Sequence, residues 1–264
     1  MFGIQNGQVK FSDAYMYYTS FGRGIKPLVM LPGLSTRGVK GAEISLFWMY
    51  RIFSKQYKVY FFDRINPVPK VYSIENMADD TVLSMKELKI EKAAVFGVSM
   101  GGMIAQSIAA KYPEMVDKLI LAVTSSRPNE TINSVVSKWI KYAEAEDYIS
   151  LNRDVFSKMY SDNYLKKNRF LLPVAERLAK PDDLSKFMIC ANACLHFDGY
   201  NSLNHIQCPV MVLGGKKDKV VTGKASEEIA EKIKCDIFMY DELGHAAYDE
   251  AKDFNQRIYD FLER

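Results

Sequence analysis

The segment that most constrains the fold is a short apolar run that meets a glycine-containing turn and continues into a helical pattern. The run is Ala93 to Phe96, the turn is Gly97-Val98-Ser99-Met100-Gly101, and small and apolar residues follow from Gly102 to Ala110. A serine on such a turn between a strand and a helix is held in a strained conformation that exposes its hydroxyl. Ser99 is therefore a candidate nucleophile. The same spacing also fits a turn of small residues that only packs a helix against a sheet.

Strand and helix patterns alternate on both sides of this turn. Short apolar strand patterns occupy residues 27–31, 57–62, 93–98, 118–123, 209–214 and 236–240. Helical patterns occupy residues 44–54, 74–88, 101–111, 223–233 and about 248–262. This alternation predicts an α/β fold, in which helices flank both faces of a mostly parallel twisted sheet. Residues 8–11 and 15–21 predict an opening hairpin ahead of it.

The alternation stops between residues 127 and 206. No strong strand pattern appears there, and aromatic residues such as Trp139, Tyr160 and Phe187 are frequent. We interpret 127–206 as a helical cap inserted into a core domain made of 1–126 and 207–264. We expect roughly two to four of the cap aromatics to line a pocket. The alternative is a helical subdomain whose aromatic residues only pack together.

Charge and composition bear on the choice of partner. The 264 residues carry 35 basic and 32 acidic side chains, and no long basic run is present. We therefore expect no nucleic-acid partner. No apolar run approaches the roughly 18 to 20 residues that span a bilayer, and the first residues lack a signal-peptide pattern. We expect a cytoplasmic protein with a small-molecule substrate, and the oligomeric state is left open between monomer and homodimer.

The cysteine pattern predicts free thiols. The four residues are Cys190, Cys194, Cys208 and Cys235. Cys190 and Cys194 share a helix face, but their neighbours are apolar and no histidine lies at ligand spacing around a second cysteine pair. We expect buried free thiols in a reducing compartment, with no metal and no organic cofactor.

A serine nucleophile needs a base within hydrogen-bond reach, and only three histidines are available. His245 follows the last strand pattern, on a loop that opens at the same sheet edge as Ser99. His196 and His205 lie in or at the end of the proposed cap, where surface or packing roles are expected. His245 is therefore the candidate base.

The carboxylate that orients the base must leave the sheet at the same edge. Asp218 does so directly after a buried strand pattern, and the interval to His245 accommodates one helix and one strand. Asp241 and Glu242 are closer to His245 in sequence and are alternatively solvated turn residues. The chain order Ser, Asp, His matches the order associated with the serine turn.

With these residues in place, nearly the whole chain resembles the α/β-hydrolase fold family. Leu31-Pro32-Gly33-Leu34 is similar to its oxyanion loop, Asp63-Arg64 to its motif after a strand, and Leu243-Gly244-His245 to its closing motif. The strand from Cys208-Pro209 to Asp218 resembles the one that bears the acid. The resemblance implies Ser99 as nucleophile, His245 as base and Asp218 as orienting acid, with the backbone N–H groups of Leu34 and Met100 as the oxyanion hole.

Two positions depart from the family pattern. Pro32 replaces the usual histidine before the oxyanion-loop glycine, which removes a side chain but leaves the Leu34 amide available. Residues 65–69 replace the glycines that often follow the Asp-Arg pair, so the pocket wall is expected to differ there.

The combined reading predicts a serine hydrolase that cleaves an ester, thioester or lactone of a small to medium, largely apolar acyl compound through an acyl-serine intermediate. A carbon–carbon bond hydrolase or an acyltransferase could use the same three residues. The alternative that is not primarily an enzyme is a ligand-binding receptor with the same fold and little turnover.

Overall fold

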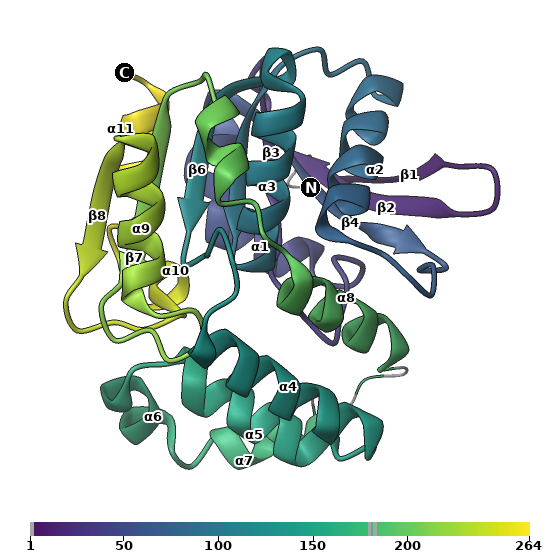
Figure 1. Ribbon diagram of the computed structural model, residues 1–264. Coiled ribbons are helices and arrows are strands. Elements are labelled where there is room, and N and C mark those ends of the chain that lie inside the picture. The colour runs from purple at the N-terminus through teal and green to yellow at the C-terminus, as the bar shows by residue number, and fades with distance from the viewer. Residues whose placement is uncertain (1–2, 179–180, 182–183) are drawn as a thin grey trace.

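The computed structural model describes residues 3–178, 181 and 184–264, and its core is one mostly parallel sheet (Figure 1). Eight strands pair in the order β1-β2-β4-β3-β5-β6-β7-β8. Strands β1 and β2 form an antiparallel hairpin, β2 also pairs antiparallel with β4, and all other pairs are parallel. The strand bounds are β1 Gln5–Lys10, β2 Tyr15–Phe21, β3 Lys26–Leu31, β4 Tyr57–Asn66, β5 Ala93–Val98, β6 Val116–Ala122, β7 Val210–Gly215 and β8 Asp236–Tyr240. The predicted α/β class and the predicted parallel pairing are confirmed.

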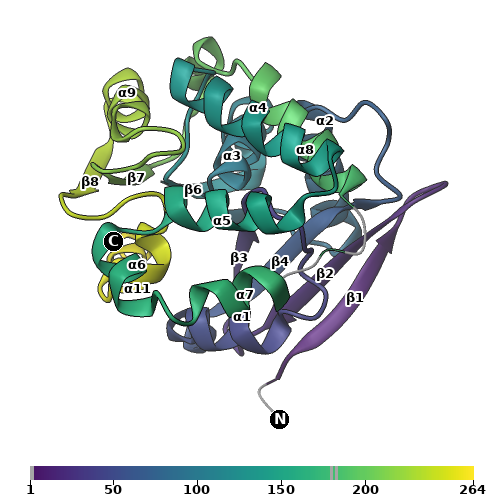
Figure 2. The same cartoon turned by 90° about the horizontal axis from the view of Figure 1, so that it is seen from below.

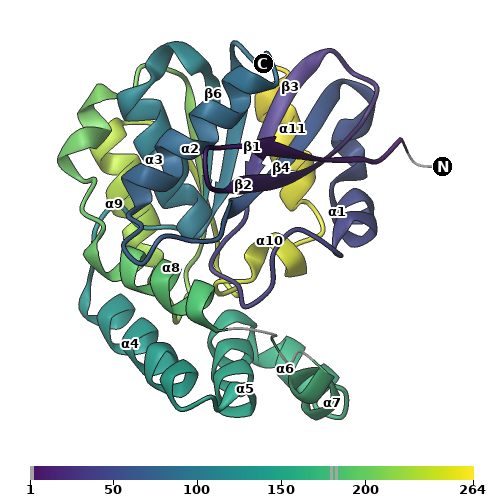
Figure 3. The ribbon, with the colours of Figure 1, turned by 90° about the vertical axis from the view of Figure 1, so that its right-hand side faces the viewer.

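Helices cover both faces of the sheet. Figure 3 shows α2, α3 and α9 on one face and α1 and α11 on the other. The bounds of these helices are α1 Glu43–Tyr50, α2 Ile74–Glu87, α3 Met100–Lys111, α9 Gly223–Ile233 and α11 Phe254–Leu262. Shorter helices complete the core, namely the 3-10 turns η1 Arg51–Lys55, η2 Pro113–Met115 and η3 Asn201–His205 and the α-helix α10 Ala247–Glu250.

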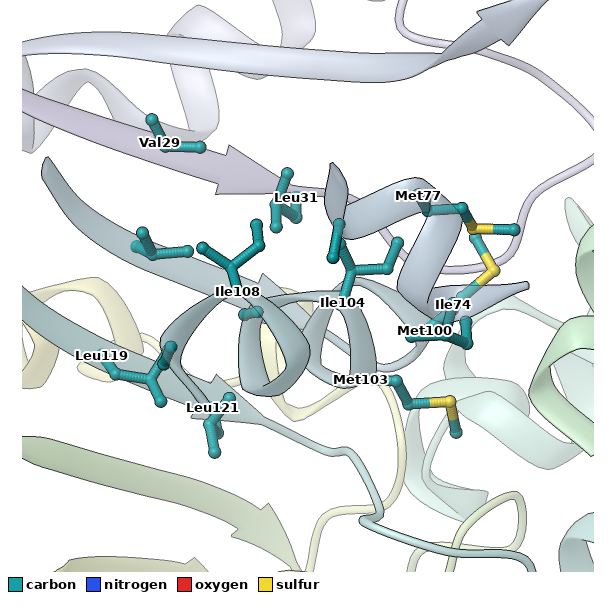
Figure 4. Packing of buried hydrophobic residues seen from close by; sticks show 14 of the residues in the cluster. Val29, Leu31, Ile74, Met77, Met100, Met103, Ile104, Ile108, Leu119 and Leu121 are labelled. Atoms are coloured by element: carbon teal, nitrogen blue, oxygen red, sulfur yellow. The ribbon is translucent and has the colours of Figure 1, made fainter. Parts of the chain in front are cut away.

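Alternate residues of the central strands supply two separate hydrophobic layers. In β5, Val95 packs with α2 and α3, whereas Phe96 packs on the opposite face with α1 and α11. Helix α3 is buried along most of its length, and Figure 4 shows Ile104 and Ile108 directed at Leu31 and neighbouring strand residues. Strong burial on both faces fixes the register of β5, because a shift by one residue would exchange the two layers. The start of α3, and with it Ser99, is held in place by this packing.

The described residues of the segment 127–206 form helices joined by loops and no strand, as predicted. The segment contains α4 Glu130–Glu144, α5 Tyr148–Met159, α6 Asp162–Asn168, α7 Leu172–Leu178 and α8 Ser185–His196. These helices lie beyond the carboxyl ends of the strands, as Figures 1 and 2 show. Trp139 of α4 and Leu151 of α5 are buried together with Val220 and Val221 from the loop after β7. The domain boundaries at 127 and 206 stay a prediction.

Several predicted elements differ from the structure in their bounds; the strand expected over 57–62, for example, runs four residues further, to Asn66. The first hairpin strand begins at Gln5, three residues earlier than expected. The helix expected over 44–54 ends at Tyr50 and continues as the 3-10 turn η1, in which Phe53 is fully buried. The closing helix is broken into α10 and α11 because Ala251 takes an extended conformation, after which Phe254 and Ile258 pack into the core. The local sequence pattern does not predict these helix ends, because tertiary packing determines them.

None of the helices in the described ranges combines the length and apolar character needed to cross a bilayer.

Candidate active site

Ser99 lies on a strained turn between β5 and α3. Its φ of 53° and ψ of −121° are unusual for a residue with a side chain. Its N–H donates to the Ala122 carbonyl at 2.9 Å, and the Thr124 hydroxyl donates to the Ser99 carbonyl at 2.7 Å. A Cβ at Gly97 would lie 2.2 Å from the Gly101 carbonyl oxygen, and one at Gly101 would lie 1.9 Å from that of Leu31. Glycine is required at both positions by close backbone contact.

His245 connects this serine to a carboxylate. Its Nε2 lies 2.9 Å from Ser99 Oγ, and its Nδ1 lies 2.8 Å from Asp218 Oδ2. The side chains of His245 and Asp218 are 5% and 1% exposed, so this hydrogen bond is shielded from water. In this arrangement Nδ1–H donates to Asp218, which leaves Nε2 free to accept the serine proton.

Backbone hydrogen bonds fix the carboxylate of Asp218. Its Oδ1 accepts from the N–H groups of Val220 at 2.7 Å and Val221 at 3.0 Å. Oδ2 therefore stays directed at His245. The turn after β7 thus fixes Oδ1 of Asp218 and leaves Oδ2 of Asp218 directed at His245.

The other candidate residues lie elsewhere. His196 is exposed at the end of α8 and bonds the Asn192 carbonyl, and His205 is exposed at the end of η3. Asp241 and Glu242 are exposed and pair with lysines of the β7 loop. The structure brings together Ser99, Asp218 and His245, and it separates the four alternatives from them.

The two backbone amides expected to bind an oxyanion belong to Met100, directly after Ser99, and to Leu34, on a loop next to it. Met100 is the first residue of α3, so its N–H has no acceptor within the helix. A Cβ at Gly33, the residue before Leu34, would lie 3.2 Å from Ser99 Cβ, which places the loop of Leu34 against the serine. An oxygen near Ser99 would also meet the positive end of the α3 dipole.

Arg64, Asp63 and Lys186 form a charged cluster that contacts the segment containing Pro32 and Leu34. Arg64 is 4% exposed, and its Nη2 donates to the Pro32 carbonyl at 2.8 Å. Asp63 accepts from the N–H of Val39 at 3.0 Å and from Nζ of Lys186, in α8, at 3.0 Å. The sequence indicated the Asp-Arg pair, but it carried no signal for its contact with Lys186, which depends on where α8 packs.

A cavity of about 350 Å³ opens onto Ser99 and His245. Its walls come from both the core and the cap, and they are mostly apolar. The apolar lining includes Met30, Leu46, Phe61, Phe96, Trp139 and Phe187. None of the described residues that line it is Asp, Glu, Lys or Arg. Trp139 and Phe187 are the cap aromatics that reach it, in keeping with the expectation for that segment.

All four cysteines are free; Cys190 and Cys194 are buried, whereas Cys208 and Cys235 are partly exposed, contrary to the expectation that all would be buried. Within the described ranges, no three His, Cys, Asp or Glu side chains converge as a metal site requires.

Comparisons with known proteins identify hydrolases as relatives of this chain. The chain is 21% identical over 264 residues to 3-oxoadipate enol-lactonase 2 of Acinetobacter baylyi, covering 96% of this chain and 94% of that protein. It is 27% identical over 184 residues to a 2-hydroxy-6-oxononadienedioate/2-hydroxy-6-oxononatrienedioate hydrolase of Paraburkholderia phymatum, covering 66% of this chain and 64% of that protein.

A solved enol-lactonase structure from Burkholderia xenovorans superposes with a TM-score of 0.85 at 21% identity, covering 98% of this chain and all of the other. The family model described as alpha/beta hydrolase fold matches residues 26–252. The chain belongs to the α/β-hydrolase fold family.

Proposed function

We propose that the protein is a serine hydrolase that cleaves an ester, thioester or lactone through an acyl-Ser99 intermediate. The observation that carries this proposal is the continuous hydrogen-bonded chain from Ser99 Oγ through His245 to Asp218, with distances of 2.9 and 2.8 Å. Relatives named as an enol-lactonase and a hydrolase support hydrolysis as the reaction class.

The reaction proceeds in two halves. His245 Nε2 accepts the Ser99 proton as Oγ attacks the acyl carbon, and the imidazolium then donates that proton to the leaving oxygen or sulfur. Water then enters and gives a proton to His245 as its oxygen attacks the acyl carbon. The imidazolium returns this proton to Ser99 Oγ as the bond between Oγ and the acyl carbon breaks, and the acid leaves. The N–H groups of Leu34 and Met100 bind the negative oxygen in both halves, and the loss of one such donor costs about 3 to 4 kcal/mol.

The cavity favours an uncharged acyl group. Its described lining carries no Lys or Arg, so a substrate carboxylate would be desolvated there without a partner. The relatives are named for 3-oxoadipate and for nonadienedioates, which are carboxylates. We propose that the acyl group of this protein's substrate is uncharged, unlike the carboxylates for which these relatives are named.

The same residues could also cleave a carbon–carbon bond or transfer the acyl group to another acceptor. A solved structure titled as a meta-cleavage product hydrolase, together with the relative named as a 2-hydroxy-6-oxononadienedioate hydrolase, supports carbon–carbon cleavage as an alternative. Release of free acid in water without an added alcohol or thiol acceptor would exclude obligatory transfer. Cleavage of a 1,3-diketone without cleavage of simple esters would favour the carbon–carbon reaction.

A fluorophosphonate probe tests the nucleophile directly. The wild-type protein should be labelled, and the Ser99→Ala variant should not. The matched control is Ser107→Ala, on the same helix α3 but away from the cavity lining, which should label as the wild type does. Equal labelling of the wild type and Ser99→Ala would remove Ser99 from the mechanism.

A further inference from the structure

Tyr50 lines the active-site cavity from the core side. It is the last residue of α1 and is 4% exposed. Its ring packs against Phe61 and Phe96, with centroid distances of 5.3 and 6.1 Å, and stacks near Phe53 at 6.4 Å. These contacts hold the ring in one orientation.

The hydroxyl of Tyr50 has no hydrogen-bond partner among the described residues. Buried phenol hydroxyls usually have one, because an unpartnered buried donor is unfavourable. Three aromatic rings surround the Tyr50 ring and offer no acceptor. The cavity is therefore the space from which a partner could come.

A second phenol lines the same cavity. Tyr248 lies in α10, three residues after His245, and its hydroxyl likewise bonds no described residue. Burial raises the pKa of Tyr50 and of Tyr248, and for Tyr50 the neighbouring Tyr248 and Asp249 raise the pKa further. Both groups remain neutral hydrogen-bond donors at physiological pH.

We infer that Tyr50 and Tyr248 form a polar subsite that binds an uncharged oxygen acceptor, such as an ether or ketone oxygen, on the acyl part of the substrate. The inference rests on the proposed function and narrows it from an apolar acyl group to one that carries an oxygen. A carboxylate is disfavoured, since no Lys or Arg lines the cavity among the described residues.

The acyl part is assigned to this end of the cavity because of its enclosure. Tyr50, Phe61 and Phe96 are at most 4% exposed, so the wall that they form is closed to solvent. The acyl group stays on Ser99 between the two halves of the reaction, whereas the leaving group must depart and water must enter. The closed end therefore suits the group that stays.

Matched esters test the subsite. One is 4-nitrophenyl hexanoate; the others replace a methylene of the chain by an ether oxygen, or carry a ketone, at successive positions. We expect the wild type to prefer at least one oxygenated ester by about tenfold in kcat/KM, the effect of one hydrogen bond. Tyr50→Phe or Tyr248→Phe should bring that ratio close to one.

The matched control is Tyr259→Phe, in α11, which removes another hydroxyl without a described partner but lies outside the cavity lining. It should leave the ratio unchanged. A wild type that shows no preference for any oxygenated ester, or a preference that survives both cavity substitutions, overturns the subsite.

A binding measurement separates this inference from the proposed reaction. In Ser99→Ala, the dissociation constants of the intact esters can be followed through the fluorescence of Trp139, which lines the cavity. The oxygenated ester should bind about tenfold more tightly, and Tyr50→Phe should remove the difference. Selective binding without Ser99-dependent turnover in the wild type would keep the subsite and reject the reaction. Equal binding of both esters would reject the subsite even if turnover is confirmed.

Discussion

Lys186 of α8 forms an ion pair with Asp63, near the carboxyl end of β4, with Nζ 3.0 Å from Oδ1. The Asp63 side chain is 12% exposed and that of Lys186 is 32% exposed. The pair therefore ties a helix of the proposed cap to the same carboxylate that holds the Val39 amide behind the Leu34 loop. The position of the cap helix α8 and the position of the segment next to the Leu34 loop therefore both depend on Asp63.

Removal of this ion pair should loosen the cap. We expect Lys186→Met to lower the free energy of unfolding by about 1 kcal/mol, because the pair is only partly shielded from water. Amide hydrogen exchange should speed up in α8, while α3 stays protected. Lys166→Met, at an exposed site of α6, is the control. Exchange in α8 that matches the control would show that apolar packing alone holds the helix.

Asp218→Asn should abolish most turnover while leaving the fold intact. The amide cannot hold His245 in the tautomer that leaves Nε2 free, and loss of this role can cost about 10⁴ in kcat. The measurement is kcat on any ester that the wild type hydrolyses, with urea denaturation to confirm folding. Asp241→Asn, at the exposed neighbour, should change kcat by less than about twofold. A comparable loss in both variants would count against Asp218 as the orienting acid.

Gly101→Ala should damage stability far more than an ordinary helix substitution does. The new methyl group would lie 1.9 Å from the Leu31 carbonyl oxygen, and neither backbone can retreat from the buried interface of α3 and β3. We expect a loss of at least about 3 kcal/mol in urea denaturation. Ser107→Ala, on the same helix, should stay within about 0.5 kcal/mol of the wild type. A mild effect at Gly101 would mean that the turn can relax.

The partly exposed cysteines should react slowly with alkylating reagents at neutral pH. Burial raises the pKa of Cys208 and of Cys235 to about 11, above the ordinary value of about 8.5. The thiolate is the reactive form, so the folded protein at pH 8 presents only about one reactive thiol in a thousand at these sites. The rate should rise about tenfold per pH unit up to about pH 11. Unfolded protein at pH 8 should react quickly, and equal rates in both states would contradict the pKa assignment.

Much of this fold was readable from the sequence because its signals are local. The buried runs of β5 and β7, and the helix after Ser99, are continuous and strongly patterned. Chain order then sufficed to bring Asp218 and His245 to the edge where Ser99 lies, since parallel strands end on the same side.

Features that depend on distant packing could not be read in this way. The break at Ala251 and the early end of α1 at Tyr50 follow from how these segments meet the sheet. Tyr50 and Tyr248 are 198 positions apart in the numbering, and neither has a local pattern that marks it as a cavity residue. Their relationship arises only when both faces of the cavity are assembled.

The cap enters the chain between β6 and β7, so a single continuous stretch contributes Trp139 and Phe187, while the floor of the cavity belongs to the sheet and α1. The cavity lining is thus divided between two regions of the chain. Exchange of the cap alone would replace the part of the wall that Trp139 and Phe187 form and would remove the partner of Asp63, whereas Tyr50, Tyr248 and the candidate catalytic residues lie outside the exchanged stretch.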